Sequence, residues 1–208
     1  MRILFQGDSI TDCGRNRTLF GDLGNGYAAF TKGELELKYP TAHEYINRGI
    51  GGDRVVDLYA KIKANLINLE PDFLSILIGV NDVWHELSEH RNGVDAEKYA
   101  KIYGMLIEEV QAALPHTKIM IMEPFCLHGT ATDPQWDTFR SEVEKRAAKA
   151  RAIAETYNLG FLPLQKGLDE LAQTMPANAV LIDGVHPTYA GHTYIKNEWI
   201  KKFEEMTR

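Results

Sequence analysis

The segment FLSILI, residues 73–78, is almost continuously apolar and follows the turn-prone pair Pro71-Asp72. A strand with this pattern is buried on both faces, which is typical of a parallel sheet covered by helices on both sides. Four shorter apolar runs occur along the chain, at Ile3–Phe5, Tyr45–Ile46, Ile119–Met122 and Phe161–Leu162. Longer segments of helical period separate these runs. The alternation predicts an α/β domain with a parallel sheet.

Two of the separating segments carry apolar residues three and four positions apart. The first covers residues 97–114, with Tyr99, Ile102, Tyr103, Leu106, Val110 and Leu114. The second lies near the C-terminus, with Ile195, Trp199 and Phe203. This spacing places the side chains on one face of a helix, so both segments are predicted to be helices with one buried stripe.

The composition favours one domain spanning residues 1–208, because 208 residues with 44% hydrophobic content suffice for one sizeable core. A formal charge of -6 and the lack of long basic runs oppose binding to nucleic acid or to anionic membranes. No segment has the length of a signal-peptide core or a membrane span, so a cytoplasmic location is expected. Cys13 and Cys126 are expected to be small buried thiols rather than a disulfide.

Ligands of parallel α/β sheets bind at the carboxyl ends of the strands, so the loops after the strands are the places to look for a site. The first loop contains Asp8 and Ser9, which could cap a helix or present a hydroxyl for chemistry. Because Thr11 replaces the last glycine, the G-x-S-x-G motif is missing. The second loop, residues 47–53, has three glycines. These allow either a tight structural turn or backbone N–H groups that face a negative oxygen.

Two further loops combine polar side chains. Asn81, after the central run, is either a turn former or an amide donor, and Trp84 is either a core residue or a substrate platform. Asp183 and His186 are three residues apart, and they are either a helix cap and a buried histidine or an acid that orients an imidazole. A parallel sheet brings all four loops to one edge. A hydroxyl, an imidazole with a carboxylate and amide donors are the components of an acyl-transfer site.

A zinc site is a weaker interpretation of the segment from His85 to His90. The second histidine comes one residue later than in H-E-x-x-H, which would rotate it by about 100° away from the shared face of a helix. No metal is therefore expected.

The four loops together resemble the GDSL family of SGNH hydrolases. The matching blocks are Gly7-Asp8-Ser9-Ile10, Gly52, Gly79-Val80-Asn81-Asp82, and Asp183 with His186, in the order of the family. The resemblance implies a flavodoxin-like three-layer α/β/α sandwich with a central parallel five-stranded sheet. It also implies a serine esterase mechanism without a cofactor.

The resemblance assigns roles to individual residues. It makes Ser9 the nucleophile, His186 the base and Asp183 the residue that orients the imidazole. The implied oxyanion hole consists of the N–H of Ser9, the N–H of Gly52 and the side chain of Asn81, with Gly51 as the alternative glycine. Residues that could contact substrate are Asp8, Arg15 and Trp84, although Asp8 is better suited to shaping the turn.

Within the family, the chain is similar to the bacterial acetylxylan esterase branch. The similarity rests on residues 7–15, Gly26-Tyr27, residues 79–84 and Val185-His186-Pro187. It implies removal of acetyl groups from sugar hydroxyls, with an ester or an acetylated oligosaccharide as the small-molecule substrate. A lipase, phospholipase or thioesterase on the same scaffold and a non-catalytic carbohydrate-binding protein are the alternatives, and a homo-oligomer is left open.

Overall fold

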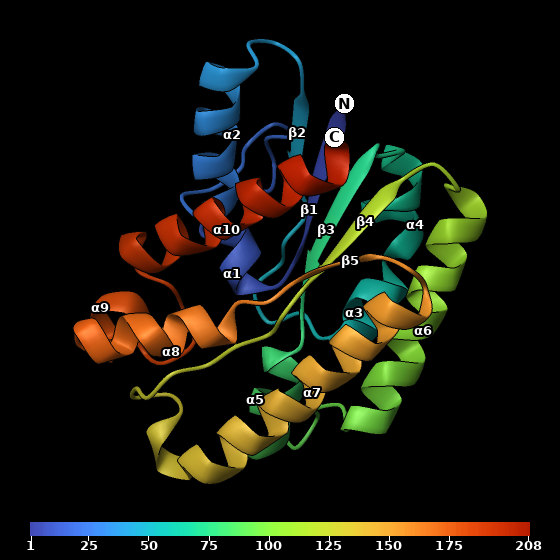
Figure 1. The fold of residues 1–208 in the computed structure, drawn as a ribbon. Coiled ribbons are helices and arrows are strands. Elements are labelled where there is room, and N and C mark those ends of the chain that lie inside the picture. The colour runs from blue at the N-terminus through green and yellow to red at the C-terminus, as the bar shows by residue number, and fades with distance from the viewer.

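The computed structural model describes all residues, 1–208, and contains one five-stranded sheet in which every neighbouring pair of strands is parallel (Figure 1). The strand order is β2-β1-β3-β4-β5. The strands are β1 (Arg2–Gly7), β2 (Glu44–Asn47), β3 (Phe73–Leu77), β4 (Lys118–Met122) and β5 (Gly160–Leu162). This order is that of the flavodoxin-like doubly wound folds, so the predicted fold class is confirmed.

The sheet is apolar on both faces because alternate residues of each central strand belong to different cores. In β1, Ile3 and Phe5 pack into one core and Leu4 into the other. In β3, Phe73 and Leu77 face the first core, while Leu74 and Ile76 face the second. The continuous apolarity of residues 73–78 therefore reflects two buried faces, as predicted.

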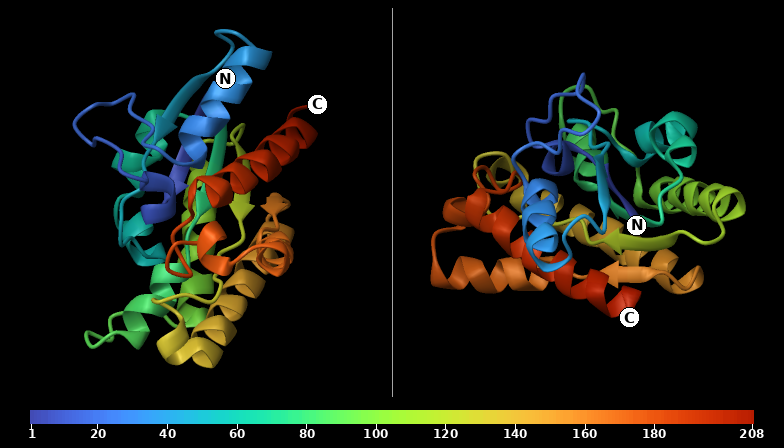
Figure 2. Two further views of the ribbon diagram at one scale, coloured as in Figure 1. Left: turned by 90° about the vertical axis from the view of Figure 1, so that its left-hand side faces the viewer. Right: turned by 90° about the horizontal axis from the view of Figure 1, so that it is seen from above.

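Helices cover both faces (Figures 1 and 2). One layer contains α2 (Tyr27–Lys38), which packs against α10 (Tyr189–Thr207), together with α8 (Gln165–Thr174) and α9 (Ala177–Val180). The other layer contains α3 (Val55–Ala60), α4 (Ile62–Asn65), the 3-10 turn η1 (Ile67–Leu69) and α6 (Ala96–Ala113). Three short elements connect these layers. Helix α1 (Ser9–Asp12) follows β1, α5 (Val80–Leu87) follows β3, and the 3-10 turn η2 (Asp133–Gln135) leads into α7 (Trp136–Thr156). None of these helices is both long and apolar enough to cross a membrane.

The two helices predicted from apolar spacing are confirmed as α6 and α10. The longest helix, α7, was not predicted, because small alanines and Arg146 take the place of large apolar side chains on much of its buried face. The structure also gives a second reason against a zinc motif at His85. Helix α5 ends at Leu87, so His90 does not lie on the same helix.

The sheet has its topological switch point between β1 and β3. The chain moves outward from β1 to β2 and then returns to the opposite side of β1 to form β3. The segments that follow β1 and β3 diverge here, which leaves room at the carboxyl edge for a ligand. Ser9 follows β1 and Asn81 follows β3, so both lie at this edge.

Candidate active site

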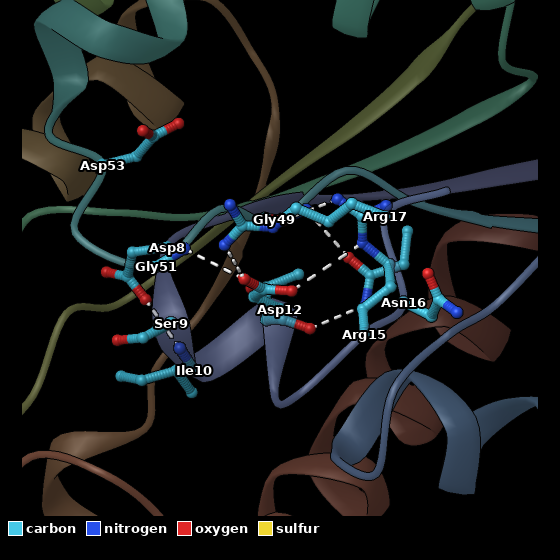
Figure 3. Close-up of polar contacts among 12 residues, drawn as sticks. Asp8, Ser9, Ile10, Asp12, Arg15, Asn16, Arg17, Gly49, Gly51 and Asp53 are labelled. Carbon is cyan, nitrogen blue, oxygen red and sulfur yellow. Dashed lines mark hydrogen bonds and ion pairs between the residues drawn. The ribbon is translucent and has the colours of Figure 1, made fainter. Parts of the chain in front are cut away.

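Ser9 is held at the edge of the sheet by a short helix that begins as soon as β1 ends. Asp8 is the N-cap of α1, and its Oδ1 accepts a hydrogen bond from the N–H of Ile10 at 3.0 Å (Figure 3). Ser9 is the first residue of that helix and is half-buried. The helix-cap and the exposed-hydroxyl interpretations of this loop are therefore compatible: Asp8 makes the cap, and Ser9 carries the hydroxyl.

The structure brings Ser9, His186 and Asp183 into one hydrogen-bonded row. The distance from Ser9 Oγ to His186 Nε2 is 2.9 Å, and that from His186 Nδ1 to Asp183 Oδ2 is 2.7 Å. The other carboxylate oxygen, Oδ1, accepts hydrogen bonds from the N–H groups of Val185 at 2.9 Å and His186 at 2.8 Å. The loop backbone thus fixes the carboxylate, which in turn fixes the ring.

The charge of Asp183 determines which ring nitrogen carries the proton. Burial raises the pKa of Asp183, but the hydrogen bonds from His186 and Val185 outweigh this effect and hold the pKa below its ordinary value. The ionised carboxylate can only accept, so Nδ1 of His186 donates to it. Nε2 is then free to accept the proton of the Ser9 hydroxyl.

The backbone donors predicted for the site differ in their hydrogen bonds. The N–H of Gly51 donates to Asp12 Oδ2 at 3.1 Å (Figure 3). The N–H of Gly52 has no acceptor in the protein. Gly52 has a φ of +86°, a conformation that other residues adopt only with strain. Of the two adjacent glycines, Gly52 is the one with a free donor.

Asn81 is held in the first turn of α5 with its side chain almost fully buried, at 4% exposure. Its Nδ2 donates to the carbonyl of Asp53 at 3.1 Å, which leaves the second N–H of the amide for another acceptor. Gly79 permits this turn, because its φ is +136° and a Cβ there would lie 3.1 Å from Pro124. The side chain of Asp82 accepts from the N–H of Val55 at 3.2 Å, which ties the loop after β2 to α5.

The three side chains predicted as substrate contacts have different positions. Asp8 is fully buried and caps α1, which agrees with the turn-shaping role, and its contact with substrate stays a prediction. Arg15 is also buried, and it lines a pocket beside the loop after β2. Trp84 is half-buried, with its ring centroid 5.7 Å from that of His186 and 6.3 Å from that of Phe139. Trp84 is thus both a packing residue and a neighbour of the imidazole.

The buried carboxyl of Asp8 predicts a pH-dependent effect on stability. Burial, with Asp82 and Asp53 nearby, raises the pKa of Asp8 from 3.8 to about 7. The folded protein keeps a proton that the unfolded chain loses, so this contribution is complete below pH 3.8 and is lost as the pH rises through about 7. Asp8→Asn keeps the cap oxygen without the charge. We expect the difference in unfolding free energy, variant minus wild type, to grow by about 2 to 3 kcal/mol between pH 5 and pH 8.

Denaturant unfolding of both proteins at the two pH values measures this difference. Asp137→Asn, at an exposed carboxyl of α7, is the control and should show the same pH dependence as wild type. A constant difference between Asp8→Asn and wild type would show that Asp8 is already ionised at pH 5.

Several residues that organise the site were not predicted from the sequence. Asn47, at the end of β2, donates from Nδ2 to the carbonyls of Thr11 and Leu23 and accepts from the N–H of Gly49. The Asp12 carboxylate pairs with Arg17 and accepts from Gly51 (Figure 3). In the sequence, these residues are marked only by the high density of polar residues after each strand. That density does not show which side chains will form hydrogen bonds with each other.

The cysteines and histidines near the site offer no second reactive centre. Cys126 is a buried free thiol, as predicted, whereas Cys13 is free but only half-buried. Its Sγ lies 3.2 Å from Nε2 of His192, whose Nδ1 accepts from the N–H of Tyr27 at 3.2 Å. Burial, with His186 nearby, lowers the pKa of His192 to about 4, so this ring is neutral and packs as a structural residue. No three His, Cys, Asp or Glu side chains are grouped to hold a metal ion.

A flavodoxin-like sheet with a serine, a histidine and an aspartate in one row is the architecture of an SGNH-type hydrolase. The model of the GDSL-like lipase/acylhydrolase family matches residues 5–194. The chain is 34% identical to an acetylxylan esterase of Geobacillus stearothermophilus over 209 residues, covering 97% of this chain and 93% of that protein. The chain belongs to the GDSL-like lipase/acylhydrolase family and is a carboxylic ester hydrolase.

Solved structures are similar over nearly the whole chain. A candidate GDSL-like lipase from Parabacteroides merdae has a TM-score of 0.90 at 36% identity, covering 98% of this chain and 95% of that chain. The Geobacillus acetylxylan esterase Axe2 has a TM-score of 0.86 at 33% identity, covering 97% of this chain and 93% of that chain. Family membership removes the non-catalytic carbohydrate-binding alternative.

Asn81→Ala tests the amide donor. If this donor acts mainly on the transition state, the substitution should lower kcat by roughly 100- to 1000-fold and change KM much less. Steady-state kinetics on nitrophenyl acetate measure both constants. A change confined to KM would instead make Asn81 a residue of ground-state binding.

Proposed function

We propose that this hydrolase is a serine esterase that removes acetyl groups from sugar hydroxyls, with Ser9, His186 and Asp183 as its catalytic triad. The observation that carries this proposal is the row formed by Ser9 Oγ, His186 Nε2 and Nδ1, and Asp183 Oδ2, with contacts of 2.9 and 2.7 Å. The Geobacillus relative lends support, because a serine, an aspartate and a histidine are each replaced in its catalytic mutants. In that relative the aspartate precedes the histidine by three positions, as Asp183 precedes His186.

The first half of the proposed reaction is acylation. Ser9 Oγ attacks the ester carbonyl while its proton moves to Nε2 of His186. Asp183 stabilises the positive charge that develops on the ring. The carbonyl oxygen becomes negative and is met by the N–H of Ser9, the N–H of Gly52 and the amide of Asn81. His186 then gives its proton to the departing alcohol.

The second half is deacylation. A water molecule enters from the solvent-exposed side, and His186, whose side chain is 37% exposed, removes a proton from it. The resulting hydroxide attacks the acyl carbon, and the same three donors stabilise the second tetrahedral intermediate. His186 returns the proton to Ser9 Oγ as the bond to the acyl group breaks. Every proton is carried by the imidazole, and no cofactor takes part.

We base the proposed acetyl substrate on the relative that is 34% identical to this chain. The lipase, phospholipase and thioesterase alternatives are distinguished by the comparison of acyl-chain lengths. The name of the Geobacillus relative, an acetylxylan esterase, agrees with an acetyl substrate.

Comparing acyl-chain lengths tests the substrate proposal. Catalytic efficiency should fall from nitrophenyl acetate to butyrate and octanoate, because each unaccommodated methylene changes specificity by about 1–3 kcal/mol. Acetate should also be released from acetylated xylo-oligosaccharides. A preference for octanoate, or failure to release acetate from any acetylated sugar, would overturn the carbohydrate-esterase proposal and leave the triad proposal intact.

A further inference from the structure

A pocket of about 360 Å³ lies beside the proposed active site and is lined by three arginines, Arg15, Arg17 and Arg48. Arg15 and Arg17 follow α1, and Arg48 follows β2, so the pocket belongs to the same edge of the sheet as Ser9. Three cations in one pocket are unexpected in a chain whose formal charge is -6. The proposed esterase mechanism uses none of these three arginines.

The carboxylates nearby do not balance these charges. Asp12 pairs with Arg17 and lies 3.9 Å from Nε of Arg15. Asp22 attracts Arg15 at longer range, but its oxygens accept from the N–H groups of Asn16 and Gly24. Arg48 has no carboxylate partner, and its guanidinium instead lies 4.4 Å from the centre of the Phe20 ring.

The arginines also have hydrogen-bond donors to spare. Arg15 is only 8% exposed, yet its buried Nε makes no hydrogen bond and has Asp12 Oδ1 at 3.9 Å, while its Nη2 donates to the carbonyl of Gly49 at 2.9 Å. Arg48 donates from Nη1 to its neighbour's carbonyl, Asn47 O, at 2.8 Å. A guanidinium has five N–H donors, and leaving a buried one unpaired is costly. Burial and the nearby Arg15 lower the pKa of Arg48, as expected for cations held close together.

Gly51 connects the pocket to the nucleophile. A Cβ on Gly51 would lie 3.7 Å from Ser9 Cβ and 3.8 Å from both Nη2 of Arg17 and Oδ2 of Asp12. Gly51 is therefore close to both Ser9 and the Arg17–Asp12 ion pair, and it has no side chain to fill the space next to them. In Figure 3, Asp12 lies between Gly51 and the two arginines Arg15 and Arg17. A substrate that extends from Ser9 over Gly51 towards Arg15 and Arg48 would pass Asp12, whose Oδ2 is already paired with Arg17 and accepts the N–H of Gly51.

We infer that the arginine pocket binds an anionic group, a carboxylate or a phosphate, on the alcohol half of the ester. Planar guanidinium groups suit both anions, because they can donate two parallel hydrogen bonds to a pair of oxygens. The inference rests on the proposed acetylesterase function: an acetyl group is too small to carry a second charged group, so the anion belongs to the alcohol. Acetylated acidic sugars, either uronates or sugar phosphates, are the substrate class.

Two matched pairs of acetyl esters test the inference. O-acetyl glucuronate is compared with O-acetyl glucuronamide, and O-acetyl glucose 6-phosphate with O-acetyl glucose, so each pair differs in the anion. We expect KM to be lower for the anionic member of at least one pair by roughly tenfold, the effect of one charge-assisted hydrogen bond. The pair that shows the difference identifies the carboxylate or the phosphate. The preference should shrink as salt is added.

Arg48→Gln should reduce the ratio of KM values between neutral and anionic esters to about one tenth of its wild-type value. Arg151→Gln is the matched control, because Arg151 also lies over a phenylalanine ring, at 4.3 Å from the centre of Phe161, but far from the pocket in the chain. Its ratio should equal that of wild type. Circular dichroism of Arg48→Gln, together with its hydrolysis of the neutral esters, verifies that the variant is folded.

The outcomes separate this inference from the function on which it rests. Equal KM values for neutral and anionic esters in wild type, or a preference that survives Arg48→Gln, would overturn the anion pocket while leaving the acetylesterase proposal standing. Failure of the wild-type protein to hydrolyse any of the four esters, with nitrophenyl acetate also uncleaved, would count against the acetylesterase proposal itself.

Discussion

Ser9→Ala is expected to lower kcat for ester hydrolysis by about a million-fold, the loss seen when the nucleophile of a catalytic triad is removed. The substitution deletes the Oγ that lies 2.9 Å from Nε2 of His186, and no other hydroxyl in the structure contacts that nitrogen. Residual hydrolysis would come from the proposed oxyanion-hole donors, which the substitution does not remove. End-point and steady-state assays on nitrophenyl acetate measure the decrease in kcat relative to wild type.

The same substitution should leave the fold intact. Ser9 is half-buried at the start of a four-residue helix, and the cap of that helix is made by Asp8. Thermal unfolding of Ser9→Ala should therefore resemble that of wild type. Ser141→Ala, at an exposed position of α7, is the matched control and should retain full activity. Activity above a few per cent of wild type in Ser9→Ala, with contamination excluded, would assign the nucleophile to another residue.

Asp183→Asn is expected to lower kcat by roughly 10⁴-fold through the tautomer of His186. The backbone N–H groups of Val185 and His186 both donate to Oδ1, so the carbonyl oxygen of the new asparagine must take that position. Its NH₂ group then replaces Oδ2 and faces Nδ1 of His186. A donor in that place forces the proton to Nε2, and the imidazole can no longer accept the proton of Ser9.

A second Asp–His pair, on exposed side chains of the neighbouring segment, provides the control for this variant. Asp133 Oδ1 lies 2.8 Å from Nδ1 of His128, and this segment is hydrogen-bonded to Asp183 through its backbone, where the N–H of Ala131 donates to the Asp183 carbonyl at 2.9 Å. Asp133→Asn makes the same substitution in an Asp–His pair whose N···O distance, 2.8 Å, is close to the 2.7 Å of the pair in the triad. This variant should leave kcat unchanged. A loss of less than tenfold in Asp183→Asn at neutral pH would show that the ring does not depend on Asp183 for its tautomer.

The sequence predicted most of the fold because the sheet is encoded by short-range patterns. The five apolar runs became the five strands, since a strand buried on both faces cannot tolerate charged residues in its interior. Helices α6 and α10 were predicted for the same kind of reason, as each has one regular apolar stripe. Helix α7 was missed because alanines and Arg146 occupy part of its buried face, so hydrophobic periodicity underestimates it.

The site was predicted in part. The residue types at the ends of the strands and the resemblance of four blocks pointed to Ser9, Asn81, Asp183 and His186, and the structure brings Ser9, His186 and Asp183 into contact. The resemblance favoured Gly52 over the adjacent Gly51 as the backbone donor. In the structure, Asp12 accepts the N–H of Gly51 across 39 positions of sequence, and the N–H of Gly52 has no acceptor in the protein.

What the sequence determined by itself was the family, the layered α/β architecture and the residues able to perform acyl transfer, because these depend on local order and periodicity. Only the tertiary structure decided which polar groups are buried, paired or free. Asp8 proved fully buried with a raised pKa, and Arg15, Arg17 and Arg48 proved to share one pocket. Burial and pairing depend on contacts between residues distant in the chain, and a linear pattern carries no information about the distances between them.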